Sequence, residues 1–275
     1  MKREDIKAGV LRIEGTNCEE ESYMAFKRLG TQAEKVHLKQ LIKQDVDPEE
    51  ERDVKDYDIL MIPGGFSAGD YIRAGAIFGA RIKSRLGKEL KSFVKTGKPV
   101  LGVCNGFQVL VEIGLLPAVH EVMSEVPNAA LETNDSNKFE CRPSLLRVEE
   151  NSNCVFTTGY EKHETVLYPS AHKEGKFVLD EKLSIEDLEN NYQVVFRYTT
   201  PDGSDPDYPW NPNGSLDDVA GICNPEGNVL GLMPHPERVF SEHTKPDWTR
   251  NGITGNKGDG RSLFESALNY LEDNF

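Results

Sequence analysis

A short apolar run that leads into a cysteine between two glycines restricts the architecture of this chain more than any other segment. The run, Pro99 to Val103, has the length and composition of a buried strand. Gly102 and Gly106 lie two residues before and after Cys104, where a sharp turn from strand to helix leaves no room for a Cβ atom. We therefore predict that Cys104 occupies the tip of such a turn, at the positive end of a helix dipole that favours the thiolate. A buried structural cysteine beside a loop is the alternative that this pattern leaves open.

A second apolar run, Val229 to Met233, ends near a histidine and a glutamate that are two residues apart. Prolines on both sides of the histidine favour extended backbone. In an extended segment such residues project to the same side, so we expect the carboxylate of Glu237 to hold and polarise the imidazole of His235. With Cys104 they would form a nucleophile, a base and a group that orients the base. The alternative is a surface His–Glu pair in a proline-rich turn, and the Cys104 turn in the same chain weighs against it.

The first hundred residues alternate between predicted strands and predicted helices. Strands are expected over residues 8–13, 33–38 and 57–62, and helices over about 18–30, 39–51 and 81–96. Thr16 or Asn17 is expected to cap the first helix. This alternation indicates parallel strands joined by crossover helices. Because ligands gather at the carboxyl ends of such strands, the Gly64-Gly65-Phe66 loop after the third strand should form the second wall of the site; the alternative is an ordinary tight turn.

The second half of the chain has a different pattern. Further elements are predicted at residues 129–148 and 166–178 (hairpin strands), 184–190 (helix), 193–198 (strand), 220–223 and 229–233 (hairpin) and 263–271 (helix). Ser184 and Asp187 are a capping pair for the short helix. Residues 241–261 are polar and glycine-rich, with no evident packing. Two polar loops, 134–142 and 171–176, can either face a substrate or merely connect strands, and the sequence leaves that choice open.

The overall composition narrows the class of partner. The formal net charge is −14 at pH 7 and no basic cluster stands out, so we expect neither nucleic acid nor an anionic membrane as a partner. The five cysteines have neither close pairing nor metal-ligand spacing, which favours a reducing compartment. The chain begins with charged residues, lacks an apolar signal core and contains no long apolar span. From these features we expect a cytoplasmic protein.

The two motifs together define a chemistry. A thiolate at Cys104 can attack an amide carbonyl and give a tetrahedral oxyanion. The Asn105 N–H, at the start of the predicted helix, and an N–H group from the loop 64–66 are placed to stabilise that charge. His235 would protonate the departing amine and then activate water against the thioester, while Glu237 fixes its tautomer. The residues thus predict amide hydrolysis through an acyl-enzyme, for either a peptide or a small molecule.

The residues around the cysteine and the histidine match a known family. Gly102 to Gln108 and Pro234 to Arg238 resemble the class I (triad) glutamine amidotransferases. The Asn-Gly-Phe-Gln version of the first motif resembles the branch formed by the glutaminase subunits of phosphoribosylformylglycinamidine synthase. Further segments similar to this branch are Gly15–Cys18, Pro63–Ser67, Gly69–Tyr71, Arg73–Ala76, Asn134–Ser136, Phe139–Glu140, Ala171–His172, Glu174–Gly175, Asn211–Ser215 and Gly258–Gly260. Other triad amidotransferases share the cysteine turn and the His–Glu pair, but not these intervening segments.

This resemblance implies a fold and an activity. The fold is a flavodoxin-like, three-layer α/β domain over residues 1–275, with a mostly parallel central sheet and added β-hairpins. The activity is hydrolysis of L-glutamine to glutamate and ammonia in purine biosynthesis. The ammonia would pass to a large ATP-dependent synthase subunit, assisted by a small accessory subunit, which converts formylglycinamide ribonucleotide to its amidine. ATP and Mg²⁺ are then expected on the synthase, with no metal or cofactor in this chain.

The resemblance also implies roles for individual residues: catalysis by Cys104, His235 and Glu237, an oxyanion hole from Gly65 and Asn105, and substrate contacts from Gly64, Phe66 and Gln108. Two residues depart from the family pattern, since Ala68 stands where tyrosine is usual and Lys173 where glycine is common. Neither belongs to the triad, but both lie in loops expected to face the substrate or the synthase. Other hypotheses are a cysteine peptidase or γ-glutamyl hydrolase on the same fold, and a regulatory module with an inactive site.

Overall fold

The centre of the protein is a mixed β-sheet. The computed structural model describes residues 1–161, 163–253, 255 and 257–275. Within these residues the sheet has nine strands, in the spatial order β2 (Gln32–His37), β1 (Lys7–Arg12), β3 (Ile59–Ile62), β4 (Val100–Val103), β11 (Val229–Leu232), β10 (Val219–Cys223), β9 (Val194–Tyr198), β6 (Glu140–Val148) and β7 (Thr165–His172). Two further strands, β5 (Ala129–Thr133) and β8 (Glu174–Leu179), pair antiparallel in a small separate sheet.

One end of the main sheet is parallel and the other is antiparallel. β2, β1, β3, β4 and β11 run parallel to one another. From β11 onward, through β10, β9, β6 and β7, each strand is antiparallel to its neighbour. Every residue of β3 and β4 is buried, as expected for parallel strands covered on both faces. The prediction of a mostly parallel core with added hairpins is confirmed.

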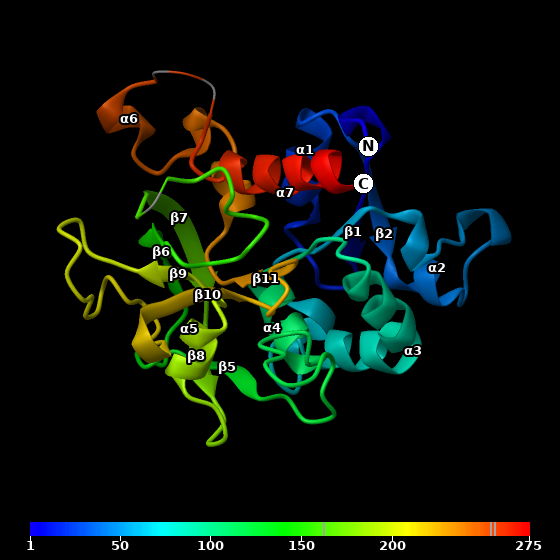
Figure 1. The fold of residues 1–275 in the computed structure, drawn as a ribbon, viewed down its shortest axis with the longest axis horizontal. Coiled ribbons are helices and arrows are strands. Elements are labelled where there is room, and N and C mark those ends of the chain that lie inside the picture. The colour runs from blue at the N-terminus through cyan, green and yellow to red at the C-terminus, as the bar shows by residue number, and fades with distance from the viewer. Residues whose placement is uncertain (162, 254, 256) are drawn as a thin grey trace.

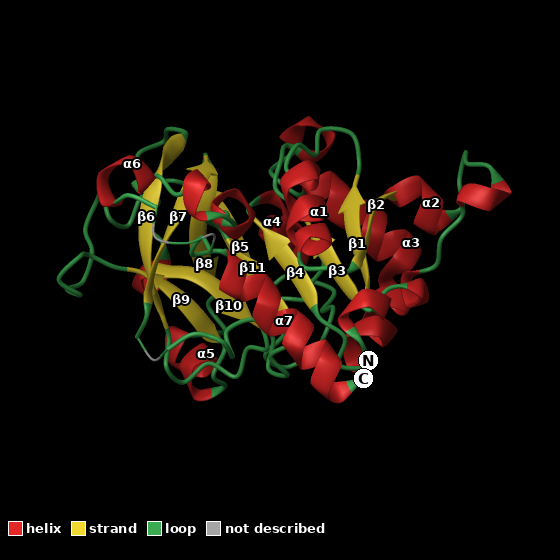
Figure 2. Cartoon of the chain, turned by 90° about the horizontal axis from the view of Figure 1, so that it is seen from above, coloured by secondary structure: helices red, strands yellow, loops and turns green. Residues whose placement is uncertain are grey.

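Helices cover both faces of the parallel core. They are α1 (Glu19–Arg28), α2 (Leu38–Ile42), α3 (Ala76–Lys95), α4 (Asn105–Glu112), α5 (Ile185–Asn190), α6 (Trp248–Asn251) and α7 (Arg261–Asn274). In Figure 1, α1 and α7 lie above the strands and α3 and α4 lie below them, and Figure 2 gives the view from above. The expected three layers are therefore present. Among the helices of the described residues, none has both the length and the apolar character needed to cross a bilayer.

Apolar side chains at helical spacing hold the two helical layers in the core. On one side, α3 buries residues spaced by four positions: Phe78, Ile82, Leu86 and Leu90. On the other side, Phe264 of α7 meets Phe26 of α1 edge-on, with ring centroids 5.2 Å apart. Burial of each such side chain contributes about 1.5–3 kcal/mol, so these layers fix the strands whose ends carry the site.

Two helix boundaries differ most from the sequence-based prediction. The helix expected over residues 39–51 ends at Ile42, because Lys43 and Asp45 adopt left-handed backbone, with φ of 53° at both. The helix expected from residue 81 begins earlier, at Ala76, directly after Gly75, whose φ is 78°. Local backbone turns of this kind set helix ends, and periodicity of apolar residues does not reveal them.

The start of α1 is capped by the backbone of another segment. The N-cap residue is Cys18, and no side chain accepts a hydrogen bond there, so the expected cap by Thr16 or Asn17 is wrong. Instead the N–H groups of Asn17 and Cys18 donate to the carbonyl of Gly64, at 3.4 and 3.2 Å. The loop after β3 supplies the acceptor that a side chain was expected to provide. These bonds also hold the segment after β1 against the loop 64–66.

The polar segment 241–261 is held at its C-terminal end, although no packing was evident from its sequence. Residues 254 and 256 lie outside the described residues. The N–H of Gly258 donates to the carbonyl of Phe240 at 3.1 Å, and a carboxylate oxygen of Asp259 accepts from the N–H of Leu167 at 3.0 Å. The expectation of no packing is thus wrong for this end, because backbone hydrogen bonds leave no apolar pattern to read.

Candidate active site

Cys104 lies at the tip of the sharp turn between β4 and α4. Its φ of 52° and ψ of −108° are unfavourable for a residue with a Cβ atom. A Cβ on Gly106 would lie 1.8 Å from the carbonyl oxygen of Ile62, and one on Gly102 would lie 2.6 Å from that of Gly106. The predicted strand-to-helix turn is confirmed, and the glycines are needed because backbone fills the space where their side chains would be. The thiol sits at the N-terminal end of α4, where the helix dipole favours negative charge.

Gly64 is the point where the parts of the site meet. A Cβ built there would lie 2.6 Å from Cε1 of His235, 3.2 Å from Sγ of Cys18 and 3.4 Å from Cβ of Cys104. The structure thus brings the cysteine and the histidine, far apart in the sequence, side by side at one rim of the sheet. The loop 64–66 lies against both of them, as expected for a loop at the carboxyl end of a parallel strand.

His235 and Glu237 form a buried hydrogen-bonded pair. Nδ1 of His235 lies 2.5 Å from Oε1 of Glu237. The backbone N–H of His235 donates to the carbonyl of Pro169 on β7 at 2.8 Å. The expected contact is present, but the expected extended geometry is wrong beyond His235, because a 3₁₀ turn begins at Pro236. Proline is favoured at the first position of such a turn, because an N–H group at that position would have no hydrogen-bond partner within the turn.

The electrostatic surroundings of His235 hold a proton on its ring. Burial lowers the pKa of this imidazole, because the charged form loses hydration. The carboxylate of Glu237 and the thiols of Cys104 and Cys18 act in the opposite direction, and the pKa of His235 lies well above its usual value. Nε2 of His235 makes no hydrogen bond to the described residues. This nitrogen is free to exchange a proton with the thiol or with a substrate.

Two backbone donors flank Cys104. The N–H groups of Gly65 and Asn105 donate to no acceptor in the described part of the chain. Asn105 is the first residue of α4, where helical N–H groups lack an intrahelical partner. Gly65 has a φ of 151°, and a Cβ there would lie 2.8 Å from the backbone nitrogen of Asn17. These two donors follow Gly64 and Cys104 directly in the chain, and their role as an oxyanion hole stays a prediction.

The side chain of Asn105 ties α4 to the loop after β3. Its Oδ1 accepts from the N–H of Ser67 at 3.3 Å, and its Nδ2 donates to Asp70 at 3.3 Å and to Oε1 of Gln108 at 3.0 Å. Nε2 of Gln108 donates to the carbonyl of Glu174 on β8. Both ends of the Gln108 amide therefore make hydrogen bonds within the protein, and this side chain links α4 to β8. Its contact with a substrate stays a prediction.

The other two expected substrate contacts lie on one loop. Gly64 is buried between Cys104 and His235. Phe66 is half exposed, and its ring centroid lies 6.3 Å from that of Phe139. Gly64 borders the thiol, and the contacts of both residues with a substrate stay predictions.

Cys18 and Arg238 are parts of the site to which sequence reasoning gave no role. The sulfur of Cys18 lies 3.0 Å from Nη2 of Arg238, and both side chains belong to the same cluster as the His–Glu pair. Ligand atoms of Cys18, His235 and Glu237 lie within 4.8 Å of one another, a donor set suited to zinc. The guanidinium bound to the sulfur competes with a cation there, so we assign the sulfur to Arg238. The position of Cys18 just after β1 was the available signal, since carboxyl ends of parallel strands share one edge.

A buried histidine on β7 completes the wall opposite the loop 64–66. The carbonyl of Ala171 lies 3.6 Å from Sγ of Cys104 as a hydrogen-bond acceptor. Burial, followed by the nearby charge of His235, lowers the pKa of His172 to about 3, so this ring is neutral. Asn134 holds His172 through its ring and its carbonyl, at 3.2 and 2.9 Å. The sequence did not decide the role of two polar loops. In the structure, the loop 171–176 contacts the site itself and the loop 134–142 supports it.

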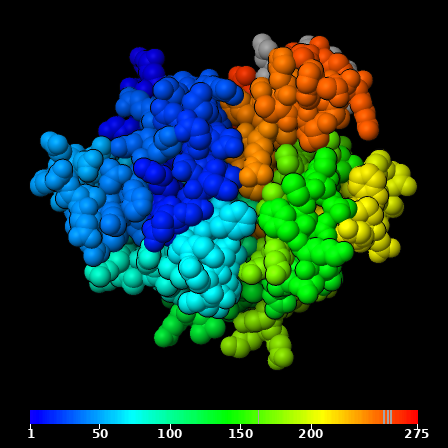
Figure 3. All heavy atoms as spheres, turned by 180° about the vertical axis from the view of Figure 1, so that it is seen from behind, coloured from blue at the N-terminus to red at the C-terminus, as the bar shows by residue number. Residues whose placement is uncertain are grey.

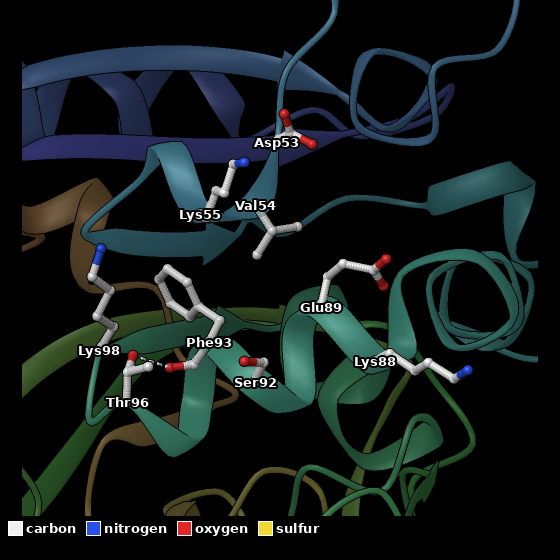
Figure 4. A pocket seen from close by; sticks show the side chains of 9 residues that line it. All are labelled: Asp53, Val54, Lys55, Lys88, Glu89, Ser92, Phe93, Thr96 and Lys98. Carbon is white, nitrogen blue, oxygen red and sulfur yellow. Dashed lines mark hydrogen bonds between the residues drawn. The ribbon is translucent and has the colours of Figure 1, made fainter.

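A surface pocket unrelated to this site lies at the other edge of the sheet. It has a volume of about 510 Å³ and lies between the turn around Val54 and the end of α3 (Figure 4). Lys98 and Phe93 on its wall precede β4, whereas Cys104 follows it. The pocket is therefore separated from the thiol by the full length of that strand.

Comparison with known proteins agrees with this geometry. The family model of the CobB/CobQ-like glutamine amidotransferase domain matches residues 5–271. The chain is 51% identical over 277 residues to the phosphoribosylformylglycinamidine synthase subunit PurQ of Archaeoglobus fulgidus, with 99% of each chain covered. It is 41% identical over 263 residues to the subunit of the same name from Picrophilus torridus, with 96% of this chain and 98% of that one covered.

A solved structure gives the same result. The structure of PurLQS from Thermotoga maritima contains a chain that is 34% identical, with a TM-score of 0.70 and coverage of 97% of this chain and 99% of that chain. The resemblance inferred from the sequence motifs is confirmed. The chain belongs to the family of phosphoribosylformylglycinamidine synthase PurQ subunits, which are glutamine amidotransferases.

Proposed function

We propose that this chain hydrolyses the side-chain amide of L-glutamine, with Cys104 as nucleophile, His235 as general acid and base, and Glu237 as the residue that orients His235. One observation carries the proposal. The buried hydrogen bond between His235 and Glu237 lies beside the strained turn that presents the thiol. A nucleophile, a base and a buried carboxylate in this order are the requirement for acyl transfer.

In the first half-reaction the thiolate attacks the carbonyl carbon of the glutamine side chain. The N–H groups of Gly65 and Asn105 donate hydrogen bonds to the carbonyl oxygen and stabilise the negative charge that develops on it. When the tetrahedral intermediate collapses, His235 gives its proton to the leaving nitrogen, and ammonia departs. The γ-glutamyl group remains on Cys104 as a thioester. The raised pKa of His235 suits this step, because the ring must hold a proton at neutral pH.

In the second half-reaction water takes the place of ammonia. His235, now neutral, removes a proton from the water, whose oxygen attacks the thioester carbon. Collapse of the second intermediate releases glutamate and restores the thiolate beside the protonated imidazole. Glu237 keeps the Nδ1 proton in place throughout, so Nε2 carries out both proton transfers. No step needs a metal or a cofactor of this chain, and ATP with Mg²⁺ is assigned to the synthase.

The ammonia is inferred to pass to a partner. The similar chain from Thermotoga maritima comes from a structure of PurLQS, and the identity of 34% supports association of this chain with PurL and PurS subunits. In that assembly the ATP-dependent synthase subunit would convert formylglycinamide ribonucleotide to its amidine. All five cysteines are free thiols, which suits the cytoplasm.

The direct experiment measures release of glutamate from glutamine by the isolated chain and by the chain with the synthase and the small subunit. Acid quenching during turnover should trap a γ-glutamyl thioester on Cys104, detected by mass spectrometry of the peptide. Absence of glutamate release in the complete assembly would refute the proposal. Turnover of γ-glutamyl peptides without turnover of free glutamine would favour a γ-glutamyl hydrolase instead.

A further inference from the structure

A backbone bridge joins the segment 14–18, which follows β1, to the segment 64–68, which follows β3. Thr16 and Gly65 face each other in an isolated antiparallel bridge. Figure 3 shows the dark-blue N-terminal part of the chain in contact with the cyan part near residue 70. The hydrogen bonds between the two segments run from the N–H groups of Asn17 and Cys18 to the carbonyl of Gly64, from Phe66 to the carbonyl of Gly15 at 2.9 Å, and from Ala68 to the carbonyl of Glu14 at 2.8 Å.

The bridge fixes the direction of the Gly65 N–H group. The carbonyl of Gly64 is bound by two N–H groups at the start of α1. The peptide between Gly64 and Gly65 is trans, so its N–H group and its carbonyl point in opposite directions. The N–H group of Gly65 therefore points away from α1.

The side chain of Asn105 lies on the side to which this N–H group points. Successive N–H groups alternate in direction along an antiparallel bridge. Those of Phe66 and Ala68 donate to the segment 14–18, whereas that of Ser67 donates to Oδ1 of Asn105 at 3.3 Å. By this alternation, the N–H group of Gly65 shares the direction of the Ser67 N–H group. It therefore faces the start of α4, where the N–H group of Asn105 is located.

Gly15 is the residue on which the bridge depends most. Its φ is 87°, and a Cβ there would lie 2.2 Å from the carbonyl oxygen of Phe66. That oxygen also accepts from the N–H group of Gly69 at 2.8 Å, so it is held in place on its other side. The hydroxyl of Thr16 stabilises the turn that carries Gly15, because its Oγ1 accepts from the N–H group of Ile13 at 3.2 Å.

We propose that Gly15 and Thr16 are positioning residues for glutamine hydrolysis, an inference that rests on the oxyanion hole of the function proposed above. Through the bridge they direct the Gly65 N–H group toward the carbonyl oxygen on which charge develops. Such a donor stabilises the charge most when it is fixed before the reaction, because no reorganisation is then needed. Gly65 has no side chain that could fix its own peptide. The bridge supplies that rigidity from outside the site.

The test compares Gly15→Ala with Gly30→Ala in the complete assembly, with the synthase and the small subunit at saturating concentration. Gly30 has a φ of 89°, and the nearest atom to a Cβ there would be Cγ of Arg3 at 3.9 Å. The control thus introduces the same backbone strain without the clash. The kcat for glutamate release should fall at least about 100-fold in Gly15→Ala, as for the loss of one oxyanion donor, and less than about 3-fold in Gly30→Ala.

Alkylation of Cys104 by iodoacetamide separates this role from a structural one. The thiolate displaces iodide from a saturated carbon, so a carbon–sulfur bond forms and no oxyanion develops. The alkylation rate of Gly15→Ala should therefore stay within about 3-fold of the native rate. Equal losses of hydrolysis and alkylation would show that the variant disturbs the thiol, and equal losses of kcat in both glycine variants would assign the effect to backbone strain. Either result would overturn the positioning role.

A second pair of variants keeps the test decisive if Gly15→Ala does not fold. Thr16→Val removes the hydroxyl that accepts from Ile13 at nearly constant volume, whereas Thr16→Ser keeps it. The kcat should fall at least about 5-fold in Thr16→Val and stay within about 2-fold of the native value in Thr16→Ser, with alkylation unchanged in both. Native kcat in Gly15→Ala or in Thr16→Val overturns the positioning role alone. Failure of the native assembly to release glutamate contradicts the proposed function itself.

Discussion

The two halves of the catalytic centre are specified in different ways. Cys104 owes its position to backbone geometry, with a φ of 52° and a glycine two residues later whose missing side chain lets Ile62 approach. His235 has ordinary backbone, with φ of −102° and ψ of 94°, and owes its orientation to a buried carboxylate 2.5 Å from its ring. The missing side chain of a glycine thus allows the position of the nucleophile, whereas a buried carboxylate orients the base. Substitutions should therefore affect the first half through packing and the second half through pH dependence.

Removal of the nucleophile has the largest expected effect. Cys104→Ala should lower glutamine hydrolysis by about 10⁵-fold or more, because no other group forms the acyl-enzyme. In the assembly, synthesis driven by added ammonia should persist, since that chemistry occurs on another subunit. Parallel assays with glutamine and with an ammonium salt measure both activities. Loss of both would mean that Cys104 holds structure rather than substrate.

The second-largest loss of rate is expected when the carboxylate beside His235 is neutralised. Glu237→Gln should lower the rate by about 10³-fold, because the amide neither stabilises the imidazolium nor selects its tautomer. The raised pKa of His235 keeps its acidic form available as the pH rises, and without the carboxylate that pKa falls. The alkaline limb of the pH–rate profile should move to lower pH. A slower variant whose alkaline limb stays in place would contradict the electrostatic role.

A side chain added at a glycine beside the nucleophile should lower the stability of the fold. A Cβ on Gly106 would lie 1.8 Å from a backbone oxygen of β3, so Gly106→Ala should lower the free energy of unfolding by about 3 kcal/mol. Gly87→Ala in α3 is the matched control, since the nearest atom would be Cε of Met123 at 3.5 Å. The control should be neutral or stabilising by up to about 1 kcal/mol. Denaturant unfolding of both variants measures the difference, and equal stabilities would show that packing does not place the nucleophile.

The smallest expected effect tests whether charge also matters in the nucleophile half. Burial, followed by the nearby carboxylate of Glu174, raises the pKa of Asp70 to about 6. A carboxyl with a raised pKa binds its proton more tightly when folded. Its contribution to stability is therefore complete below its unfolded pKa of about 3.9 and is lost as the pH rises through the folded value.

Asp70→Asn should consequently be more stable than the native chain at pH 8, with the difference vanishing toward pH 4. The gain should stay below about 1 kcal/mol, because solvent screens this half-buried group. Thermal unfolding across this pH range measures it. A gain of the same size at pH 4 would contradict the role of ionisation.

Local patterns in the sequence predicted most of the fold. The apolar runs of β3, β4 and β11, the hairpin turn before β11 and the capping pair of α5 appear in the structure where the sequence placed them. Predictions failed where distant backbone decides a local outcome. The cap of α1 comes from Gly64 rather than from Thr16 or Asn17, and the contact of His235 with its carboxylate forms through a 3₁₀ turn rather than an extended strand.

The linear order of residues was sufficient for the strand-to-helix turn at Cys104 and for the pairing of His235 with Glu237, because each depends on neighbours within a few positions. It was not sufficient for the assignment of Cys18 to Arg238 or for the hydrogen bonds that Gln108 makes within the protein. Those features depend on which strand ends share an edge and which side chains meet there. Only the packed sheet and its helices determine both, since they join segments that the chain itself keeps far apart.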